Sequence, residues 1–225
     1  MIYVIYVDDI RHPSGTTLLV SSMLCQATRT EGEQMARSQA EKAESRAKIL
    51  RIAGSELRAR GLEGVGVAEV MSAAGMTHGG FYKHFESRDH LVEAAIAALL
   101  QEIEETKAEA ENWNRGGSSL SSYIDWYLSD EHRSKPGEGC PVAALGIDMS
   151  RANDRTRTVF TKGLARFVEW IVDKLPAGPA RRRQDRAALI ASALVGGVVL
   201  ARASSNLEFS EQILKSVRKE LKALG

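Results

Sequence analysis

The decisive stretch of the chain spans residues 74–91 and reads AGMTHGGFYKHFESRDHL. Gly75 follows a short helical pattern over residues 67–74 and precedes another over residues 77–85, so it is placed to form the tight turn between two helices. Two short helices joined by such a turn form a helix-turn-helix, whose second helix can enter the major groove of DNA. Two short helices joined by a turn occur in many helical proteins, so the function has to be predicted from the identities of the residues.

The rest of the chain also predicts helices. A first helix over residues 36–60 ends at Gly61 and Gly64, and Ser87 caps a fourth that runs from Arg88 to about residue 114. Helices are then predicted over residues 120–133, 141–151, 155–175, 181–203 and 210–223. No strand alternation follows residue 35. The predicted fold class is therefore all-α, with an N-terminal helix-turn-helix DNA-binding domain and a C-terminal helical domain.

Composition narrows the function classes. The 225 residues carry a net charge of only +1, so any contact with nucleic acid must come from a local basic patch. Cys25 and Cys140 are too few for a disulfide framework, which fits the reducing cytoplasm. The chain lacks a phosphate-binding glycine loop, ligands at metal spacing and a nucleophile elbow. We therefore expect no enzyme, no cofactor and no metal.

The first 34 residues differ from the rest. A β-prone run over residues 2–7 is followed by an apolar run over residues 18–25 that is too short to span a membrane. Met35 then opens a polar, helix-forming stretch. We predict Met35 as the natural initiator and residues 1–34 as an extra or disordered segment. The DNA-binding domain is then expected over residues 35–90 and the C-terminal domain over residues 91–225.

Residues 74–85 closely resemble the signature of the TetR family, Ala-Gly-Val-Ser-x-Gly-x-Leu/Phe-Tyr-x-His-Phe, and residues 86–91 resemble the start of that family's fourth helix. The resemblance covers about residues 45–98, and the order of later helices is similar to the family's ligand-binding and dimerisation domain. It implies a homodimer that binds a palindromic double-stranded DNA operator, most often a repressor, and releases it on binding a small apolar or electrophilic inducer. An activator remains an alternative.

The resemblance and the chemistry of the side chains indicate the DNA contacts. Residues on the first turn and exposed side of the second helix would reach base edges: His78, Gly79, Gly80 and Lys83. Donors suited to phosphate oxygens are Thr77, Tyr82, His84 and Arg88. As an alternative, Tyr82 and His84 pack the corner locally. Basic residues around the first helix either add phosphate contacts or form a solvated face: Arg37, Lys42, Arg46 and Lys48.

Two departures from the family pattern keep a second function open. Gly66 stands where a Ser or Thr usually caps the second helix, and Gly79 with Gly80 should weaken the recognition helix by about 1 kcal/mol each. Glycines at such a surface favour a close approach of the backbone to DNA. The alternative is a helical protein-interaction module that has lost specific DNA binding.

The C-terminal domain carries an apolar ligand pocket or an ordinary core, depending on how its bulky residues pack: Trp126, Tyr127, Met149, Phe160, Phe167 and Trp170. Residues 189–201 are almost wholly apolar, and the last helix offers Ile213, Leu214, Val217 and Leu221. In the family the last two helices pair across the dimer; burial within the monomer is the alternative.

Cys140 lies in the sequence Gly-Cys-Pro-Val at the start of a predicted helix, where the helix dipole favours a thiolate. Some oxidant- and electrophile-sensing members of the family have a Cys in a similar setting. Cys140 is therefore a candidate redox or electrophile sensor, with simple burial as the alternative.

Overall fold

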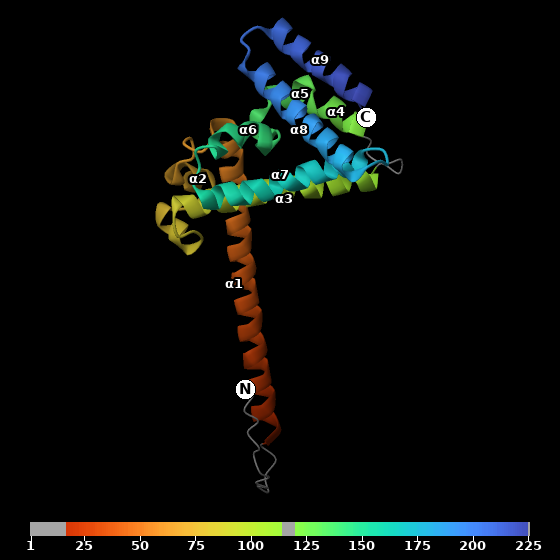
Figure 1. The fold of residues 1–225 in the computed structure, drawn as a ribbon. Coiled ribbons are helices and arrows are strands. Elements are labelled where there is room, and N and C mark those ends of the chain that lie inside the picture. Colours follow the sequence, from red (N-terminus) through yellow and green to blue (C-terminus); the bar gives the residue numbers. More distant parts are fainter. Residues whose placement is uncertain (1–16, 114–119, 225) are drawn as a thin grey trace. The chain divides into compact units, whose positions relative to one another are not determined.

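Helices make up the regular structure of the protein in a computed structural model (Figure 1). The structure describes the backbone of residues 17–113 and 120–224, and the side chains of residues 35–102 and 120–224. Neither backbone range contains a strand, which confirms the all-α prediction. The β-prone run over residues 2–7 lies outside the described residues. The elements are α1 (Thr17–Arg60), α2 (Val67–Ala73), η1 (His78–Lys83), α3 (Arg88–Trp113), α4 (Leu120–Tyr127), α5 (Asp130–Ser134), η2 (Pro136–Glu138), α6 (Pro141–Met149), α7 (Asp154–Lys174), α8 (Ala180–Ala203) and α9 (Leu207–Leu224).

Residues 1–45 and residues 46–225 form two separate compact units. The first helix begins at Thr17, so our predicted start at residue 36 was wrong. Part of the segment that we expected to be extra or disordered is therefore helical, and Met35 as the initiator stays a prediction. Within the first unit, Arg37 and Glu41 form an exposed ion pair one helical turn apart, with 3.1 Å between Nε and Oε1.

The helix-turn-helix region packs around a small apolar core. Ile49, Ala53 and Leu57 repeat along one face of α1 and are fully buried. They share the core with side chains of the following elements, Val70, Met71, Phe81, Phe85 and Leu91. Gly75 has φ +73°, a left-handed conformation that glycine adopts without strain, and it forms the predicted turn between α2 and η1. The predicted corner is therefore present.

Two predicted helices take a different form. The segment predicted as a third helix over residues 77–85 is a 3₁₀ helix over His78–Lys83, and Thr77 makes no side-chain cap. Two consecutive glycines explain the short, tight form, because glycine is a poor α-helix former. The predicted helix over residues 120–133 is broken after Tyr127, because Ser129 is extended and its hydroxyl caps α5 by accepting a bond from the His132 amide.

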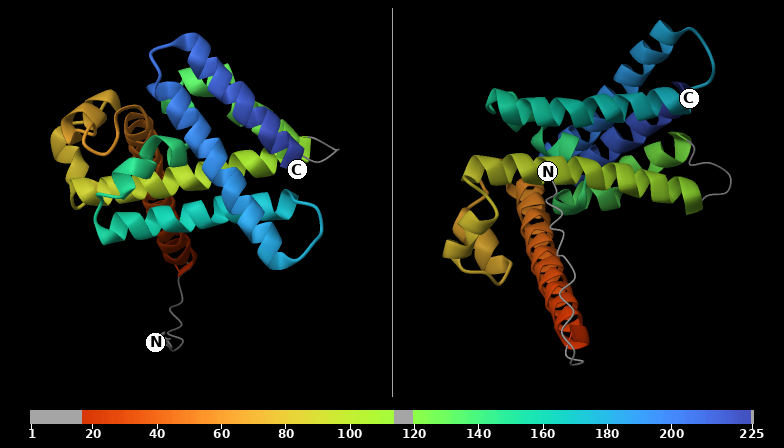
Figure 2. Two further views of the ribbon diagram at one scale, coloured as in Figure 1. Left: turned by 45° about the horizontal axis from the view of Figure 1, so that its top comes forward. Right: turned by 90° about the horizontal axis from the view of Figure 1, so that it is seen from below.

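The long helices of the C-terminal domain pack in succession, α3 against α7, α7 against α8 and α8 against α9. Helices α3 and α7 lie side by side in all the views (Figures 1 and 2), and Gly163 lets them approach, because a Cβ there would lie 2.5 Å from the Leu100 side chain. Helices α8 and α9 form an antiparallel pair. Helix α6 lies between these pairs and the DNA-binding region, and it buries Val142, Leu145 and Met149.

Helix α8 is long and apolar enough to cross a membrane by length and composition alone. One of its faces belongs to the core of the protein, through Ile190, Leu194 and Val198, which are fully buried. Our prediction that the whole apolar run over residues 189–201 is buried holds for that face only, because Leu189 and Leu200 are more than half exposed, at 55% and 59%.

Candidate nucleic-acid interface and effector site

The recognition segment, residues 77–88, presents most of the predicted DNA contacts to solvent. Tyr82 is the most conspicuous: its ring is 69% exposed and meets the buried Phe81 ring edge-on at 5.3 Å. The other exposed members of the predicted set are Thr77, His78, Gly79 and Lys83, while Gly80, His84 and Arg88 are half-buried. The Tyr82 ring therefore lies outside the packed core, among exposed polar and basic groups.

Anchors beneath this surface hold the recognition segment in place. The rings of Phe81 and Phe85 stack in the core with their centroids 5.7 Å apart. Arg46 of α1 places its guanidinium 4.2 Å from the centre of the Phe85 ring and also donates a hydrogen bond to the His84 carbonyl. Sequence reasoning assigned Arg46 to phosphate contacts or to a solvated face; the structure shows it tying α1 to the end of η1.

Arg88 also forms hydrogen bonds within the DNA-binding domain. Its Nε donates to the carbonyl of Val65 at 3.0 Å and its Nη2 donates to the carbonyl of Leu62. These bonds fasten the start of α3 to the turn between α1 and α2. Ser87 caps α3 as predicted, through its hydroxyl and the amide of His90, 3.1 Å apart. Any phosphate contact by Arg88 therefore comes on top of a structural role.

The aromatic residues of the predicted pocket are only partly brought together. Tyr123, which the sequence did not single out, lies at the centre: its ring is 4.5 Å from that of Trp170 and 5.7 Å from those of Trp126 and Tyr127. Phe167 completes the group, stacked with Tyr127 at 6.3 Å. We call these five residues the aromatic cluster.

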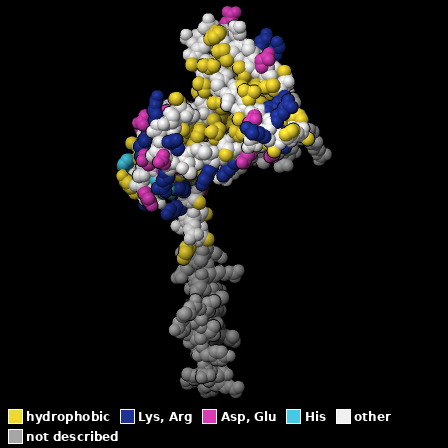
Figure 3. Space-filling view, in the orientation of Figure 1, with side chains coloured by type: hydrophobic (Ala, Val, Ile, Leu, Met, Phe, Trp, Pro, Cys, Tyr) yellow, Lys and Arg dark blue, Asp and Glu magenta, His cyan; other side chains and the backbone are white. Residues whose placement is uncertain are grey.

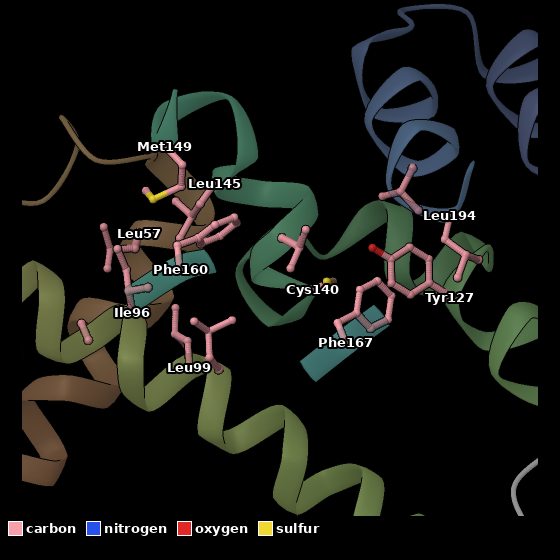
Figure 4. Packing of buried hydrophobic residues seen from close by; sticks show 14 of the residues in the cluster. Leu57, Ile96, Leu99, Tyr127, Cys140, Leu145, Met149, Phe160, Phe167 and Leu194 are labelled. Carbon is pink, nitrogen blue, oxygen red and sulfur yellow. The ribbon is translucent and has the colours of Figure 1, made fainter. Parts of the chain in front are cut away.

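Met149 and Phe160 lie apart from the aromatic cluster. Figure 4 shows them at the other end of α6, together with Leu57 and Leu145. All four side chains belong to the buried core of the protein. For Met149 and Phe160 the structure thus favours the alternative that we kept open, an ordinary core position between α6, α7 and α1.

A buried polar group borders the aromatic cluster. His132 is held at both ring nitrogens: Nε2 accepts a hydrogen bond from the Cys140 amide at 2.9 Å, so Nδ1 carries the proton that is donated to the Tyr127 carbonyl at 2.6 Å. Arg202 of α8 donates to the His132 carbonyl at 2.5 Å. Burial lowers the pKa of His132, which keeps the ring neutral in this arrangement. None of these bonds leaves a signal in hydrophobic periodicity, so the sequence did not reveal the group.

Cys140 and the Tyr127 hydroxyl meet in this region (Figure 4). The Cys140 side chain is buried, at 7% exposure, and the residue is the N-cap of α6 as predicted. The Tyr127 hydroxyl is fully buried and forms no hydrogen bond of normal geometry. Its polar neighbour is the Cys140 thiol, which is a weak hydrogen-bonding group. Burial, followed by the proximity of Cys140, raises the pKa of Tyr127 well above its usual value.

Helices α8 and α9 carry a separate apolar surface, which Figure 3 shows as a concentration of hydrophobic side chains. Its exposed members, which we call the α8–α9 face, are Leu189, Val199, Leu200, Leu207 and Phe209. The stripe predicted on the last helix lies elsewhere: Leu214 and Leu221 are buried within the monomer, and Val217 packs near Gly197 of α8.

Comparisons with known proteins match both parts of the chain. A sequence model of bacterial regulatory proteins of the tetR family matches residues 49–95, and a model of the C-terminal domain of LmrA/YxaF-like transcriptional regulators matches residues 117–219. An HTH-type transcriptional regulator of Mycobacterium tuberculosis, Rv0196, is 28% identical over 182 residues, which cover 74% of this chain and 89% of the relative.

Solved structures share the fold. A TetR transcriptional regulator from Chloroflexus aurantiacus superposes with a TM-score of 0.65 at 22% identity, over 81% of this chain and 96% of its own. The reduced form of NemR from E. coli gives a TM-score of 0.63 at 18% identity, over 78% of this chain and 96% of its own. At these identities the likeness concerns the fold, in which a helix-turn-helix precedes a larger helical domain.

Proposed function

We propose that the chain is a homodimeric repressor in the cytoplasm and that it leaves a palindromic operator when a small inducer binds. The chain belongs to the TetR family of bacterial transcriptional regulators, which are DNA-binding proteins rather than enzymes. The observation that carries this proposal is the recognition segment. It turns Tyr82 outward while Phe81 and Phe85 fasten it to the core. The recognition segment can therefore enter the major groove of DNA while the core beneath it stays folded.

The contacts divide by chemistry. His78 and Lys83 would reach base edges, and Thr77 and Tyr82 would bind phosphate oxygens and set the register. Gly79 has open space where a side chain would stand, so nothing in the free protein requires a glycine there. The backbone of η1 would therefore approach the DNA closely at this point, which a larger side chain would prevent.

The α8–α9 face supports the homodimer. Its apolar side chains are exposed in the single chain, and a contiguous apolar surface on helices is a common protein-protein interface. Pairing two copies through a two-fold axis would place two recognition segments for two half-sites. The palindromic operator follows from this symmetry.

The aromatic cluster and Cys140 support the inducer. An apolar molecule would pack against Trp126 and Trp170, and the buried Tyr127 hydroxyl would gain a hydrogen-bond partner. An electrophilic inducer would react at Cys140: its sulfur would bond to the β-carbon of an unsaturated carbonyl compound, and the thiol proton would pass to the α-carbon. Either event would shift the DNA-binding domains between competent and incompetent spacings.

The experiment is a selection of DNA by the full-length protein. The purified chain is incubated with fragments of its own genome at moderate salt, and the bound DNA is sequenced. Enrichment of one palindrome upstream of a few genes supports the proposal, and transcription from that promoter with and without protein separates a repressor from an activator. Binding no better than bulk DNA would favour the alternative, an interaction module that has lost specific DNA binding.

A further inference from the structure

The Tyr127 hydroxyl is a buried polar group that the fold itself does not need. The side chain is completely buried, and the hydroxyl oxygen has no hydrogen-bond partner of normal geometry. Burying a hydroxyl in this way costs about 1–3 kcal/mol, a cost that a phenylalanine at the same position would avoid. The hydroxyl therefore points to a partner that comes from outside the chain.

The polar side chain beside this hydroxyl is the Cys140 thiol. Figure 4 shows the oxygen of Tyr127 turned toward the Cys140 sulfur. His132 lies close by, but both of its ring nitrogens are engaged, Nε2 by the Cys140 amide and Nδ1 by the Tyr127 carbonyl. The Phe167 ring stacks on the Tyr127 ring at 6.3 Å and makes the surroundings apolar. A nucleophilic sulfur and a hydrogen-bond donor thus lie side by side in a buried, apolar place.

The electrostatics of this place favour a ligand oxygen that gains negative charge. Burial raises the pKa of Tyr127 well above its usual value, so the hydroxyl keeps its proton at neutral pH and can donate it in a hydrogen bond. The Arg202 guanidinium lies close enough to Tyr127 and Cys140 to interact with both electrostatically. In a buried place, a fixed donor and a nearby positive charge stabilise a developing oxyanion strongly.

We propose that Tyr127 is the hydrogen-bond donor that selects conjugated carbonyl compounds and activates them for reaction with Cys140. In such a compound the carbonyl oxygen and the β-carbon are the two ends of one conjugated unit, so Tyr127 can hold the oxygen while the neighbouring sulfur meets the carbon. This inference rests on the proposed function for its effect on DNA binding. It narrows the inducer to a class of compound that the hydroxyl recognises.

The reaction is an addition that needs no further reactant. The Cys140 sulfur bonds to the β-carbon, and the electron pair of the carbon–carbon double bond shifts to give an enolate. The enolate oxygen accepts the hydrogen bond from Tyr127, which stabilises the charge as it forms. The proton that the thiol releases then bonds to the α-carbon, so the product is a thioether with its carbonyl restored.

Trp126 covers the pair of groups on the solvent side. Its ring is 50% exposed, stacks on the His132 ring at 5.1 Å and meets the Tyr127 ring edge-on at 6.2 Å. The two residues beneath it are buried. A compound that displaces the Trp126 side chain reaches the hydroxyl and the sulfur. A change in this cover alters the access of every thiol reagent, whereas loss of the hydroxyl alters only the reaction of compounds that carry a conjugated carbonyl.

The test compares two thiol reagents and needs no DNA. The full-length protein carries Cys25→Ser, so that Cys140 is the remaining thiol. It is treated with cyclohexenone, a conjugated ketone, or with methyl methanethiosulfonate, which transfers a methylthio group and has no carbonyl. The mass of the intact protein reports the rate of each reaction. We expect Tyr127→Phe to slow the reaction with cyclohexenone by about tenfold or more and to change the other rate by less than about twofold.

Two variants control for access and for loss of an aromatic hydroxyl. Trp126→Ala should speed both reactions to a similar extent, because it opens the cover. Tyr123→Phe, which removes the same atom from a half-buried ring of α4, should leave the ratio of the two rates unchanged. An equal effect of Tyr127→Phe on both reagents, or no effect on either, would overturn the inference. So would a wild-type Cys140 that forms no adduct with cyclohexenone.

Operator binding separates this inference from the proposed function. The affinity for the selected operator is measured before and after complete modification by cyclohexenone. An adduct whose rate depends on the Tyr127 hydroxyl but which leaves operator affinity unchanged would refute the inducer role and leave the selectivity of Tyr127 standing. Release from the operator by cyclohexenone at the same rate in the wild type and in Tyr127→Phe would refute the selectivity and leave the proposed function standing.

Discussion

Replacing Tyr127 by Phe should stabilise the protein, against the usual direction of a core substitution. The Tyr127 side chain is 0% exposed and its hydroxyl lacks a hydrogen bond of normal geometry. A hydroxyl buried in this way costs about 1–3 kcal/mol relative to water, and the adjacent Cys140 thiol recovers little of it. Tyr127→Phe removes that cost and leaves a void of one atom.

The expected magnitude follows from these two contributions. The void costs on the order of a few tenths of a kcal/mol, since destabilisation scales with cavity volume. The net gain in the free energy of unfolding is then about 1 kcal/mol, which raises Tm by roughly 2–4 °C for a chain of this size. If the hydroxyl is reserved for an inducer, the same variant also responds less to it, as expected where stability is given up for function.

Differential scanning calorimetry of the two proteins at one concentration measures the effect. Tyr123→Phe is the matched control, because it removes the same atom from the same helix at a half-buried position. We expect no stabilisation from that change. A fall of Tm in Tyr127→Phe by 2 °C or more would show that the hydroxyl contributes to the fold, and the reasoning from an unpartnered group would be refuted.

Three further outcomes are expected. Burial lowers the folded-state pKa of His132, so this residue binds fewer protons in the folded than in the unfolded protein, and stability falls as the pH drops below about 6.5. Thermal melts of His132→Gln should lack that part of the loss. A pH dependence of Tm identical to that of the wild type would contradict the assignment. Gly80→Leu should not lower Tm, since glycine is the poorer helix former and a Cβ there meets only Thr77 and Met71, at 3.6 and 3.7 Å. It should nevertheless weaken operator binding at least tenfold by fluorescence anisotropy, and full affinity would exclude close backbone approach. Leu200→Asp should convert a dimer into a monomer by light scattering, whereas Ile147→Asp, on a still more exposed residue of α6, should not; a dimer that survives Leu200→Asp would place the interface elsewhere.

Hydrophobic periodicity and turn chemistry predicted most of the fold. Gly61 and Gly64 marked the end of α1, and Gly75 marked the turn because its left-handed φ is a local property. The break after Tyr127 was missed, since the apolar pattern continues through it and only the cap by Ser129 ends the helix. The 3₁₀ form of η1 was also missed, although the weakness of the two glycines had been recognised.

The candidate sites were predictable only in part. Motif residues of the recognition segment could be named from the sequence because they follow one another along one short helix, and their contacts with DNA stay a prediction. The structural roles of Arg46 and Arg202 could not be predicted, because each acts through a backbone group more than 35 positions away in the chain. Aromatic residues could be named as pocket or core, but periodicity could not show that Tyr123 joins them.

Sequence-specific binding can be measured by titrating the full-length protein with the selected operator and with a scrambled duplex of the same length and composition. We predict two protomers per palindrome, and an affinity for the operator that exceeds that for the scrambled duplex by about 10³-fold or more at physiological salt. Equal affinity for the two duplexes would contradict sequence-specific recognition by residues 77–88.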